Sequence, residues 1–359
     1  MEQELRRYEY YIIGAGPAGA TLARVLSDKG FNVLVADAAP KPGMKPCGRG
    51  IPDSQDLPFK IPSECVQREV KGATLYVDGV RAFTVTGLKG YIIDRECLTR
   101  SLLEGSDLAL KAYYDMRTGT LRLNGEKVKL DPRRVIIAGG NPFYPGEKIN
   151  AVQEIYKGET PDELIIYFDT ELIGYYWIFP GAPGYVEVGV GGFSDVSDLR
   201  TRLRRFLREN KEARSTLREG PFRVEGAKIA VGGVAEDLVS RVPVHIGEAA
   251  GYVLPLTGEG IRPSIVSAYR LAEALTRGGS PRDILKSDIT RSITLHRKIL
   301  NAVKSMKPEL RRELLLSIPE RLHVKVALGK VSARDIMAAL ARRPTLLFKL
   351  RKFMGGGVK

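Results

Sequence analysis

Three glycines and one carboxylate near the N-terminus have the types and spacing that bind a dinucleotide. They lie after an apolar segment, residues 8–13, and a second apolar segment, residues 31–36, ends at the carboxylate. In such a turn the first glycine permits a sharp bend, the second lets the backbone approach a pyrophosphate, and the third lets the next helix pack on the strand. That helix offers N–H groups to phosphates, and the carboxylate suits a ribose hydroxyl. The pattern predicts a dinucleotide site, rather than a purely structural turn, formed by Gly14, Gly16, Ala18, Gly19 and Asp37.

A second glycine-rich segment, residues 246–263, indicates which dinucleotide is bound. Its sequence, IGEAAGYVLPLTGEGIRP, resembles the distal flavin motif of FAD proteins similar to p-hydroxybenzoate hydroxylase. In that family an acidic side chain holds the ribityl chain, and a helix N-terminus stabilises the anionic reduced ring. The family has Asp where this chain has the longer Glu248, so we expect the ribityl contact to shift or to be lost. The resemblance implies FAD as cofactor, with contacts from Glu248, Gly258, Gly260 and Ile261.

Three further segments resemble the geranylgeranyl reductase family, flavoenzymes that saturate isoprenoid chains, including archaeal lipids. Residues 175–180 (YYWIFP) with Gly189 and Gly191 match the family's YxWxFP and GxG motifs. Residues 45–51 (KPCGRGI) resemble its Cys-Gly loop near the flavin, and residues 93–98 (IDRECL) resemble a segment whose arginine lies near FAD. The resemblance covers roughly residues 8–280 and implies cofactor contacts from Cys47, Gly48 and Arg95.

The chain departs from that family in two respects. The family's Ala-Asp-Gly segment corresponds to residues 137–140, where the sequence is IAGG and the aspartate is missing. The chain, with 359 residues, is also short for the family. A reduced C-terminal region would alter the size of the substrate.

The aromatic motif also has a physical interpretation of its own. On a strand Tyr175, Trp177 and Phe179 point to one face, because side chains alternate with a period of two. Three rings in a row form a wall for a long apolar chain and attract developing positive charge. Periodicity alone favours an ordinary sheet core, whereas the nearby proline and glycines favour a substrate surface. We therefore predict catalytic roles for Tyr175 and Trp177, and a substrate surface formed by Tyr175, Trp177, Phe179, Pro180, Gly189 and Gly191.

Cys47 is the strongest candidate for proton transfer. Reduction of an isolated alkene requires a hydride from flavin N5 on one carbon and a proton on the other. A thiol with an ordinary pKa of about 8.5 is protonated near neutral pH and can donate that proton. The alternative is a small structural residue in a loop rich in proline and glycine. The sequence leaves the redox state of Cys47 open.

The other cysteines and the loop cations receive structural interpretations. Cys47, Cys65 and Cys97 have irregular spacing, which predicts neither a disulfide framework nor a metal site, although a Cys47–Cys65 disulfide is left open. Lys45 and Arg49 are candidates for binding a head-group phosphate, but charged loop residues are commonly just solvated. The three histidines are isolated in the sequence, and we expect no metal.

The leading functional hypothesis is an FAD-dependent oxidoreductase of lipid biosynthesis. It would saturate C=C bonds of a polyprenyl chain, such as geranylgeranyl, on a lipid, a diphosphate or a quinone. NADPH, ferredoxin or another electron-donor protein is left open as the reductant. The main alternative is an FAD-dependent monooxygenase of a small or apolar substrate, which shares the fold. A nucleic-acid-binding protein is disfavoured, because we find neither a zinc pattern nor an RNA-binding motif.

Charge is concentrated at the C-terminus. The chain has a net charge of +14, of which residues 281–359 carry +13 and the rest only +1. Within residues 341–359, apolar Leu346, Leu347, Leu350 and Phe353 alternate with arginines and lysines, which favours an anionic membrane face. A solvated basic helix packed on the body is the alternative. With neither a signal peptide nor a membrane span in the sequence, we expect a cytoplasmic protein, peripheral on the cytoplasmic membrane face.

These observations predict an α/β chain, α+β overall. A Rossmann-like FAD-binding domain would consist of residues 1–50, 94–145 and 226–280. An antiparallel sheet domain for substrate binding and catalysis would consist of residues 51–93 and 146–225. Residues 281–359 would form a basic helical region.

Overall fold

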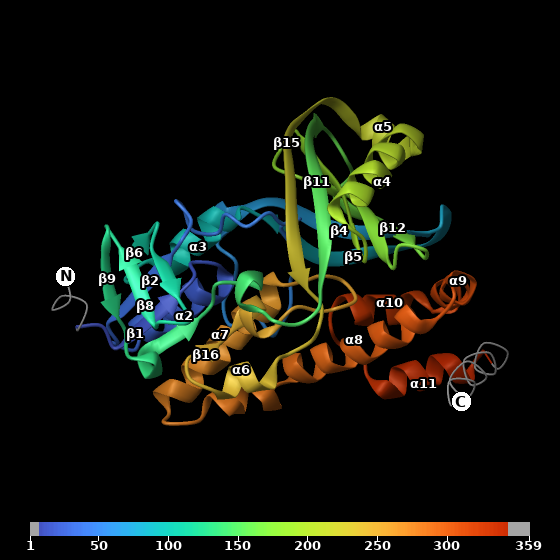
Figure 1. Cartoon of the computed structure of the whole chain (residues 1–359). Coiled ribbons are helices and arrows are strands. Elements are labelled where there is room, and N and C mark those ends of the chain that lie inside the picture. Colours follow the sequence, from blue (N-terminus) through green and yellow to red (C-terminus); the bar gives the residue numbers. More distant parts are fainter. Residues whose placement is uncertain (1–6, 344–359) are drawn as a thin grey trace. The chain divides into compact units, whose positions relative to one another are not determined.

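The computed structural model describes residues 7–343 (Figure 1). The chain divides into two compact units. Unit 1 consists of Met1–Val66, Ile93–Lys148 and Ile229–Thr294. Unit 2 consists of Gln67–Ile92, Ile149–Lys228 and Leu295–Lys359.

Unit 1 contains a parallel sheet with the strand order β16-β10-β1-β2-β6. Its central strand is buried on both sides, since Ile12 pairs with Ile136 in β10 and with Val35 in β2. A parallel strand covered on both faces has an almost continuous apolar sequence, as β1 has. The strands are β1 (Tyr10–Ile13), β2 (Val33–Asp37), β6 (Asp107–Leu110), β10 (Val135–Ile137) and β16 (Val244–His245).

Three helices accompany this sheet: α2 (Pro17–Ser27), α3 (Arg95–Leu103) and α7 (Ile261–Thr276). Helix α2 packs against both α3 and α7 (Figure 1). It begins at Pro17, whose fixed φ suits the first helical position. Small residues on α2, among them the fully buried Ala20 and Ala23, let its neighbours approach closely.

The rest of unit 1 is a small meander and short connecting elements. The meander is antiparallel and has the order β7-β8-β9, formed by Tyr113–Asp115, Thr120–Leu123 and Glu126–Lys129. The connecting elements are β3 (Gly50–Pro52), η1 (Ser63–Cys65), η2 (Pro132–Arg134), η3 (Asn141–Phe143), α6 (Glu236–Ser240), η4 (Gly247–Ala250) and η5 (Pro281–Lys286).

Unit 2 contains seven strands of a mostly antiparallel eight-stranded sheet, in the order β15-β11-β14-β13-β12-β4-β5. Strands β11, β14, β13 and β12 are antiparallel neighbours, whereas β12 and β4 run parallel. The strands are β4 (Val66–Val77), β5 (Val80–Ile93), β11 (Lys148–Gly158), β12 (Glu163–Asp169), β13 (Gly174–Pro180), β14 (Tyr185–Gly192) and β15 (Leu217–Ala230). Together with the Rossmann-like sheet of unit 1, this sheet confirms the predicted α/β fold class.

The core of unit 2 lies between one face of this sheet and two helices, α4 (Val196–Glu209) and α5 (Lys211–Thr216). Ile178, Val188 and Leu199 are all fully buried there. Residues 196–216 form two helices rather than one continuous helix. Asn210 ends α4 and then caps α5, because its side chain accepts a hydrogen bond from the N–H of Ala213 at 2.8 Å.

The sequence pattern does not predict β15. Its alternation is broken by charged residues and by Gly220 and Pro221. Such residues are tolerated in β15 because it is an edge strand, where one row of backbone groups faces away from the ladder.

Helices follow in the C-terminal part: α8 (Asp288–Ser305), α9 (Pro308–Ser317), α10 (Glu320–Ala327) and α11 (Ala333–Ala341). Instead of the separate region predicted for residues 281–359, residues up to Thr294 cluster with unit 1 and later ones with unit 2. Thr290 contacts Tyr252 of unit 1 at 3.2 Å, and Arg311 donates to the carbonyl of Thr170 in unit 2 at 2.6 Å. The amphipathic basic segment around Leu346, Leu347, Leu350 and Phe353 lies outside the described residues.

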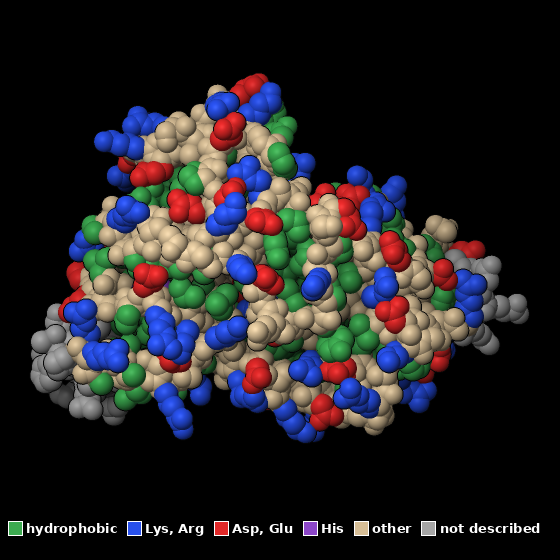
Figure 2. Space-filling view, turned by 180° about the vertical axis from the view of Figure 1, so that it is seen from behind, with side chains coloured by type: hydrophobic (Ala, Val, Ile, Leu, Met, Phe, Trp, Pro, Cys, Tyr) green, Lys and Arg blue, Asp and Glu red, His purple; other side chains and the backbone are tan. Residues whose placement is uncertain are grey.

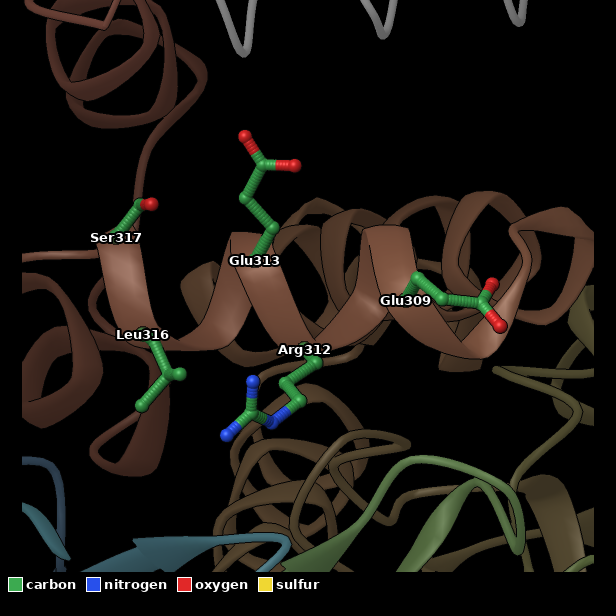
Figure 3. Close-up of a pocket in the computed structure, with 5 residues that line it drawn as sticks. All are labelled: Glu309, Arg312, Glu313, Leu316 and Ser317. Carbon is green, nitrogen blue, oxygen red and sulfur yellow. The ribbon is translucent and has the colours of Figure 1, made fainter. Parts of the chain in front are cut away.

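The surface has no single concentration of charge in the view of Figure 2, where basic, acidic and apolar side chains are interspersed. Within the described C-terminal helices, Arg291, Arg312 and Lys325 have acidic partners, the last being Asp335 at 2.5 Å. On α9, a hollow of about 350 Å³ is lined by Glu309, Arg312, Glu313, Leu316 and Ser317 (Figure 3). Across residues 7–343, no helix is both long and apolar enough to cross a bilayer.

Candidate functional site

The glycine-rich turn of unit 1 has the geometry of a phosphate-binding turn. Gly14 has a φ of 114°, and a Cβ there would lie 2.6 Å from the carbonyl oxygen of Ala138. A Cβ on Gly19 would collide with the carbonyl of Gly14, so the helix can pack on the strand only if this residue is glycine. Beside Gly16, in contrast, the space is open. Two glycines are therefore required by packing, and the third leaves room for a ligand at the N-terminus of α2.

Asp37 joins the end of β2 to this turn. Its carboxylate accepts hydrogen bonds from the N–H of Ala15 at 2.5 Å and from the N–H of Ala39 at 2.7 Å. The predicted ribose acceptor thus holds the turn in place by accepting from its backbone. Each carboxylate oxygen retains a further lone pair, which keeps Asp37 able to accept a ribose hydroxyl.

Glu248, on η4, is held by two other parts of unit 1. Its Oε2 lies 2.5 Å from the ammonium of Lys45, and its Oε1 accepts from the N–H of Ala230 at 3.1 Å. Sequence reasoning favours a solvated Lys45, and the ion pair corrects this: the side chains are only 31% and 12% exposed. The longer Glu248 reaches the segment that carries the cysteine.

The segment of residues 43–49, here named the Cys47 loop, is fixed at several points. The N–H of Gly43 donates to the carbonyl of Ala15 at 3.1 Å, which ties the loop to the glycine-rich turn. Cys47 is partly exposed and takes part in no disulfide, and the N–H of Arg49 donates to its Sγ at 3.3 Å. Gly48, also predicted to touch the cofactor, is partly exposed in the same loop.

Arg95 begins α3 and is 9% exposed. Its guanidinium donates to the carbonyl of Lys45 at 2.5 Å. Besides its predicted contact with the cofactor, Arg95 therefore holds the backbone of the Cys47 loop.

The start of α7 carries a buried ion cluster. Gly258 has a φ of 70°, which favours glycine, and Gly260 is the residue before Ile261, where the helix begins. Arg262 is 1% exposed; its guanidinium contacts Glu259 at 2.8 Å and Asp56 at 2.5 Å. Burial raises the pKa of the Glu259 carboxyl, and the guanidinium opposes that rise. The cluster anchors a helix N-terminus whose first N–H groups have no partner within the helix.

The predicted aromatic wall exists on β13 in unit 2. The ring centroids of Tyr175 and Trp177 lie 6.0 Å apart, and those of Trp177 and Phe179 lie 6.2 Å apart. Trp177 pairs with Gly189 across the strands, and a Cβ on that glycine would clash with the indole ring, 2.2 Å from its nearest atom. Tyr175 pairs in the same way with Gly191. The GxG motif therefore makes room for the wall, and Pro180 ends β13 as a buried residue.

Sequence reasoning missed Glu187, which lies on the same face of the sheet. It pairs with Phe179 across the strands and is fully buried. Gln153 pairs with Gly189 on the other side of β14 and donates to Glu225 at 2.7 Å. The period of two along β14 places residue 187 on the face of both GxG glycines, so a carboxylate there was detectable. The sheet face that carries the aromatic wall therefore also carries the carboxylate of Glu187 and the amide of Gln153.

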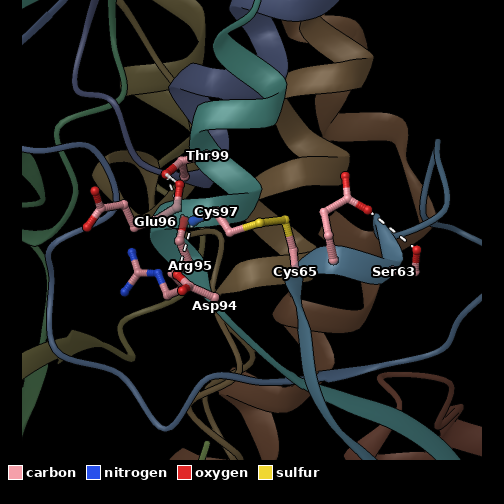
Figure 4. The surroundings of a disulfide bond; sticks show 8 residues. Ser63, Cys65, Asp94, Arg95, Glu96, Cys97 and Thr99 are labelled. Carbon is pink, nitrogen blue, oxygen red and sulfur yellow. Dashed lines mark hydrogen bonds between the residues drawn. A yellow bond between two sulfur atoms is a disulfide. The ribbon is translucent and has the colours of Figure 1, made fainter.

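The cysteines differ from the prediction in one respect. Cys65 and Cys97 form a disulfide with a Cα–Cα distance of 5.3 Å, although their spacing in the sequence gave no reason to pair them (Figure 4). A Cys47–Cys65 disulfide is thereby excluded. Among the described residues, no group of acidic, histidine or cysteine side chains is arranged to hold a metal ion.

Comparisons with known proteins agree with this arrangement. The model of the NAD(P)-binding Rossmann-like domain matches residues 12–49. The chain is 29% identical to a geranylgeranyl diphosphate reductase of Rhodobacter capsulatus over 77% of this chain and 78% of that protein. It is 25% identical to digeranylgeranylglycerophospholipid reductase 2 of Methanopyrus kandleri over 95% of this chain and 98% of that protein. The chain is thus similar to geranylgeranyl reductases over most of its length.

Solved structures agree at the level of the fold. A geranylgeranyl bacteriochlorophyll reductase-like protein of Thermoplasma acidophilum superposes with a TM-score of 0.74 at 20% identity, covering 96% of this chain and 99% of that one. PqsL of Pseudomonas aeruginosa, a probable FAD-dependent monooxygenase, has a TM-score of 0.61 at 19% identity, covering 86% and 98% of the two chains. The chain thus shares its fold with proteins that are described with more than one activity.

The predicted site residues fall into two groups. The glycine-rich turn, Asp37, the Cys47 loop, Arg95, Glu248 and the start of α7 all belong to unit 1. Within unit 1, direct contacts connect the turn to the loop, the loop to Arg95, and the loop to Glu248. The aromatic wall with its glycines belongs to unit 2. Each unit thus brings together one part of the predicted site.

Proposed function

We propose that the protein is an FAD-dependent reductase that saturates C=C bonds of a polyprenyl chain on a lipid, a diphosphate or a quinone. The observation that carries this proposal is the match to reductases of prenyl compounds over most of the chain. The match to the Methanopyrus kandleri protein covers 95% of the chain, enough to include both the aromatic wall and the Cys47 loop. A monooxygenase is the second candidate, because PqsL has a related fold.

The residues of unit 1 fit FAD. The open space beside Gly16 lies at the N-terminus of α2, where a pyrophosphate meets free N–H groups and a positive helix dipole. The start of α7 offers a second helix N-terminus, reached through the glycines Gly258 and Gly260, for the anionic end of a reduced flavin. Asp37 keeps lone pairs for a ribose, and Glu248 keeps them for the ribityl chain.

The chemistry divides between the cofactor and two parts of the chain. Bound and reduced, FAD supplies a hydride to one carbon of the double bond. Cys47 gives the proton of its thiol to the other carbon and regains a proton from water, so that each turnover adds two hydrogens. Tyr175, Trp177 and Phe179 line the apolar chain and stabilise positive charge that develops on its carbons.

The test uses flavin-loaded protein, reduced without oxygen by dithionite. Addition of a geranylgeranylated lipid is expected to restore the absorbance of oxidised flavin, because the double bonds accept the electrons. Unchanged reduced flavin with the lipid, the diphosphate and the quinone would contradict the proposal. Oxygen uptake that depends on NADPH and rises with a small aromatic substrate would favour the monooxygenase.

The electron donor and the place of action belong to the same proposal. NADPH and reduced ferredoxin are the two donors to compare, by the rate at which each reduces the bound flavin. A polyprenyl lipid resides in a bilayer, and we propose that the basic residues 341–359 bring the protein to its anionic face. Deletion of these residues is expected to abolish sedimentation with anionic vesicles while the flavin absorbance remains.

A further inference from the structure

The disulfide holds the segment that precedes and begins α3. It joins Cys97, in the first turn of α3, to Cys65 at the end of η1 (Figure 4). Beside it, the N–H of Asp94 donates to the carbonyl of Cys65 at 2.8 Å, and the Asp94 carboxylate accepts from the N–H of Cys97 at 3.0 Å. The residues from 93 to 97 are consequently fixed against η1 by one covalent bond and one backbone hydrogen bond.

The same segment supports the Cys47 loop on both sides of its cysteine. Arg95 donates to the carbonyl of Lys45, and the N–H of Ile93 donates to the carbonyl of Arg49 at 3.1 Å. At Gly43 a Cβ would lie 2.8 Å from the carbonyl oxygen of Arg95, so the loop packs directly on the first turn of α3. A displacement of residues 93–97 would therefore displace the loop as well.

The two cysteine residues differ in exposure. Cys65 is fully buried, whereas Cys97 is partly exposed. A thiolate attacks the sulfur that it can reach, so reduction would begin at Cys97. Inside cells a disulfide that persists is uncommon outside hyperthermophiles, and redox-sensing pairs are one of the classes that occur there.

We propose that the Cys65–Cys97 disulfide is a redox switch that sets the position of the Cys47 loop. A dithiol reductant is the partner: one thiolate bonds to the sulfur of Cys97, and Cys65 leaves as a thiolate that takes up a proton. The second thiol of the reductant then forms its own disulfide and releases the Cys97 thiol. Two electrons pass to the protein, residues 93–97 lose their covalent tie to η1, and the Cys47 loop is released.

The experiment measures the alkylation rate of Cys47 by iodoacetamide in the flavin-loaded full chain, by peptide mass spectrometry, before and after reduction. We expect roughly tenfold faster alkylation after reduction, as expected for the loss of about one strong hydrogen bond that holds the loop. The measurement does not depend on reductase activity, so it stands apart from the proposed function.

Two variants complete the test. The double variant Cys65→Ala/Cys97→Ala is expected to show the fast rate under both conditions. Arg95→Gln keeps the disulfide but removes one support of the loop, and it is expected to raise the rate in the oxidised protein. Equal rates at Cys47 in oxidised and reduced wild-type protein would overturn the switch and leave the disulfide a structural crosslink. The wild-type comparison decides the matter even if the double variant does not fold.

Discussion

The indole of Trp177 lies against Gly189, where a Cβ would come within 2.2 Å of the ring. The chain has one tryptophan, so tryptophan fluorescence reports the surroundings of this ring. Gly189→Ala is expected to displace the indole, to shift the emission and to cost about 1–3 kcal/mol of unfolding free energy, as overpacking does.

Gly191→Ala is the matched control for that substitution. A Cβ on Gly191 would lie 3.4 Å from the Cβ of Ala151 and 3.7 Å from the indole, which are ordinary contact distances. The tryptophan emission and the denaturation midpoint of the Gly191→Ala variant should stay close to those of the wild type. If Gly189→Ala behaved like Gly191→Ala, the close packing of ring and glycine would be refuted.

The pair of Lys45 and Glu248 should be worth more than a surface pair. Lys45→Met leaves the mostly buried carboxylate of Glu248 without its cation and is expected to lower the unfolding free energy by about 1–2 kcal/mol and to weaken flavin binding. The control is Lys41→Met. Lys41 lies 3.5 Å from Glu96, with side chains 58% and 35% exposed, so a loss of less than about 0.5 kcal/mol is expected. Denaturant unfolding gives the free energy of unfolding, and titration of flavin fluorescence gives the affinity for flavin. Equal effects of Lys45→Met and Lys41→Met would refute the difference between this ion pair and a surface pair.

His323 makes stability depend on pH. Burial lowers the pKa of its imidazole to about 4, although a hydrogen bond to the carbonyl of Leu315 acts in the opposite direction. The pKa in the folded state lies below the unfolded value of about 6.5, so the neutral ring makes its full contribution to stability above pH 6.5. The free energy of unfolding then decreases as the pH falls from 6.5 towards 4. The free energy of unfolding should fall by about 3 kcal/mol over this pH range.

His323→Gln removes the titrating ring but keeps a donor for that carbonyl. His245 also has a pKa lowered by burial, so the difference between wild type and variant isolates His323. Denaturant unfolding at several pH values should show a smaller slope for the variant between pH 6.5 and 4. Parallel curves would mean that His323 does not titrate in this range.

The disulfide should contribute strongly to stability. The residues it joins are 32 apart in the sequence, and closing a loop of this size in the unfolded chain corresponds to about 3–4 kcal/mol. Cys97→Ser is expected to lose that amount, whereas Cys47→Ser should change stability by less than about 1 kcal/mol. Chemical denaturation without a reductant gives both values. A loss at Cys97 no larger than that at Cys47 would show that the bond does not form in solution.

Local patterns predicted the parts of the site that depend on neighbouring residues. The glycine-rich turn is specified by residues close together in the chain, each with its own steric role. The aromatic wall follows from the period of two on β13, and the GxG glycines opposite it agree with that register. Such features need no knowledge of how distant segments meet.

Contacts between distant segments were not predictable in this way. Lys45 and Glu248 are 203 residues apart, and either one alone is a charged residue in a loop. Cys65 and Cys97 meet only because η1 lies against the first turn of α3, which the spacing of cysteines does not reveal. The edge strand β15 has the composition of a loop, and its pairing with β11 depends on a sheet already formed.

The most direct test of the proposed activity is the mass of the product. Flavin-loaded protein, reduced in the absence of oxygen, is incubated with a geranylgeranylated lipid, and the mass of the extracted lipid is measured by mass spectrometry. We expect a gain of two hydrogens for each double bond reduced, and a much slower gain for a Cys47→Ala variant that still binds flavin. A lipid of unchanged mass, with flavin bound and reduced and with the diphosphate and quinone substrates also unchanged, would contradict the proposed activity.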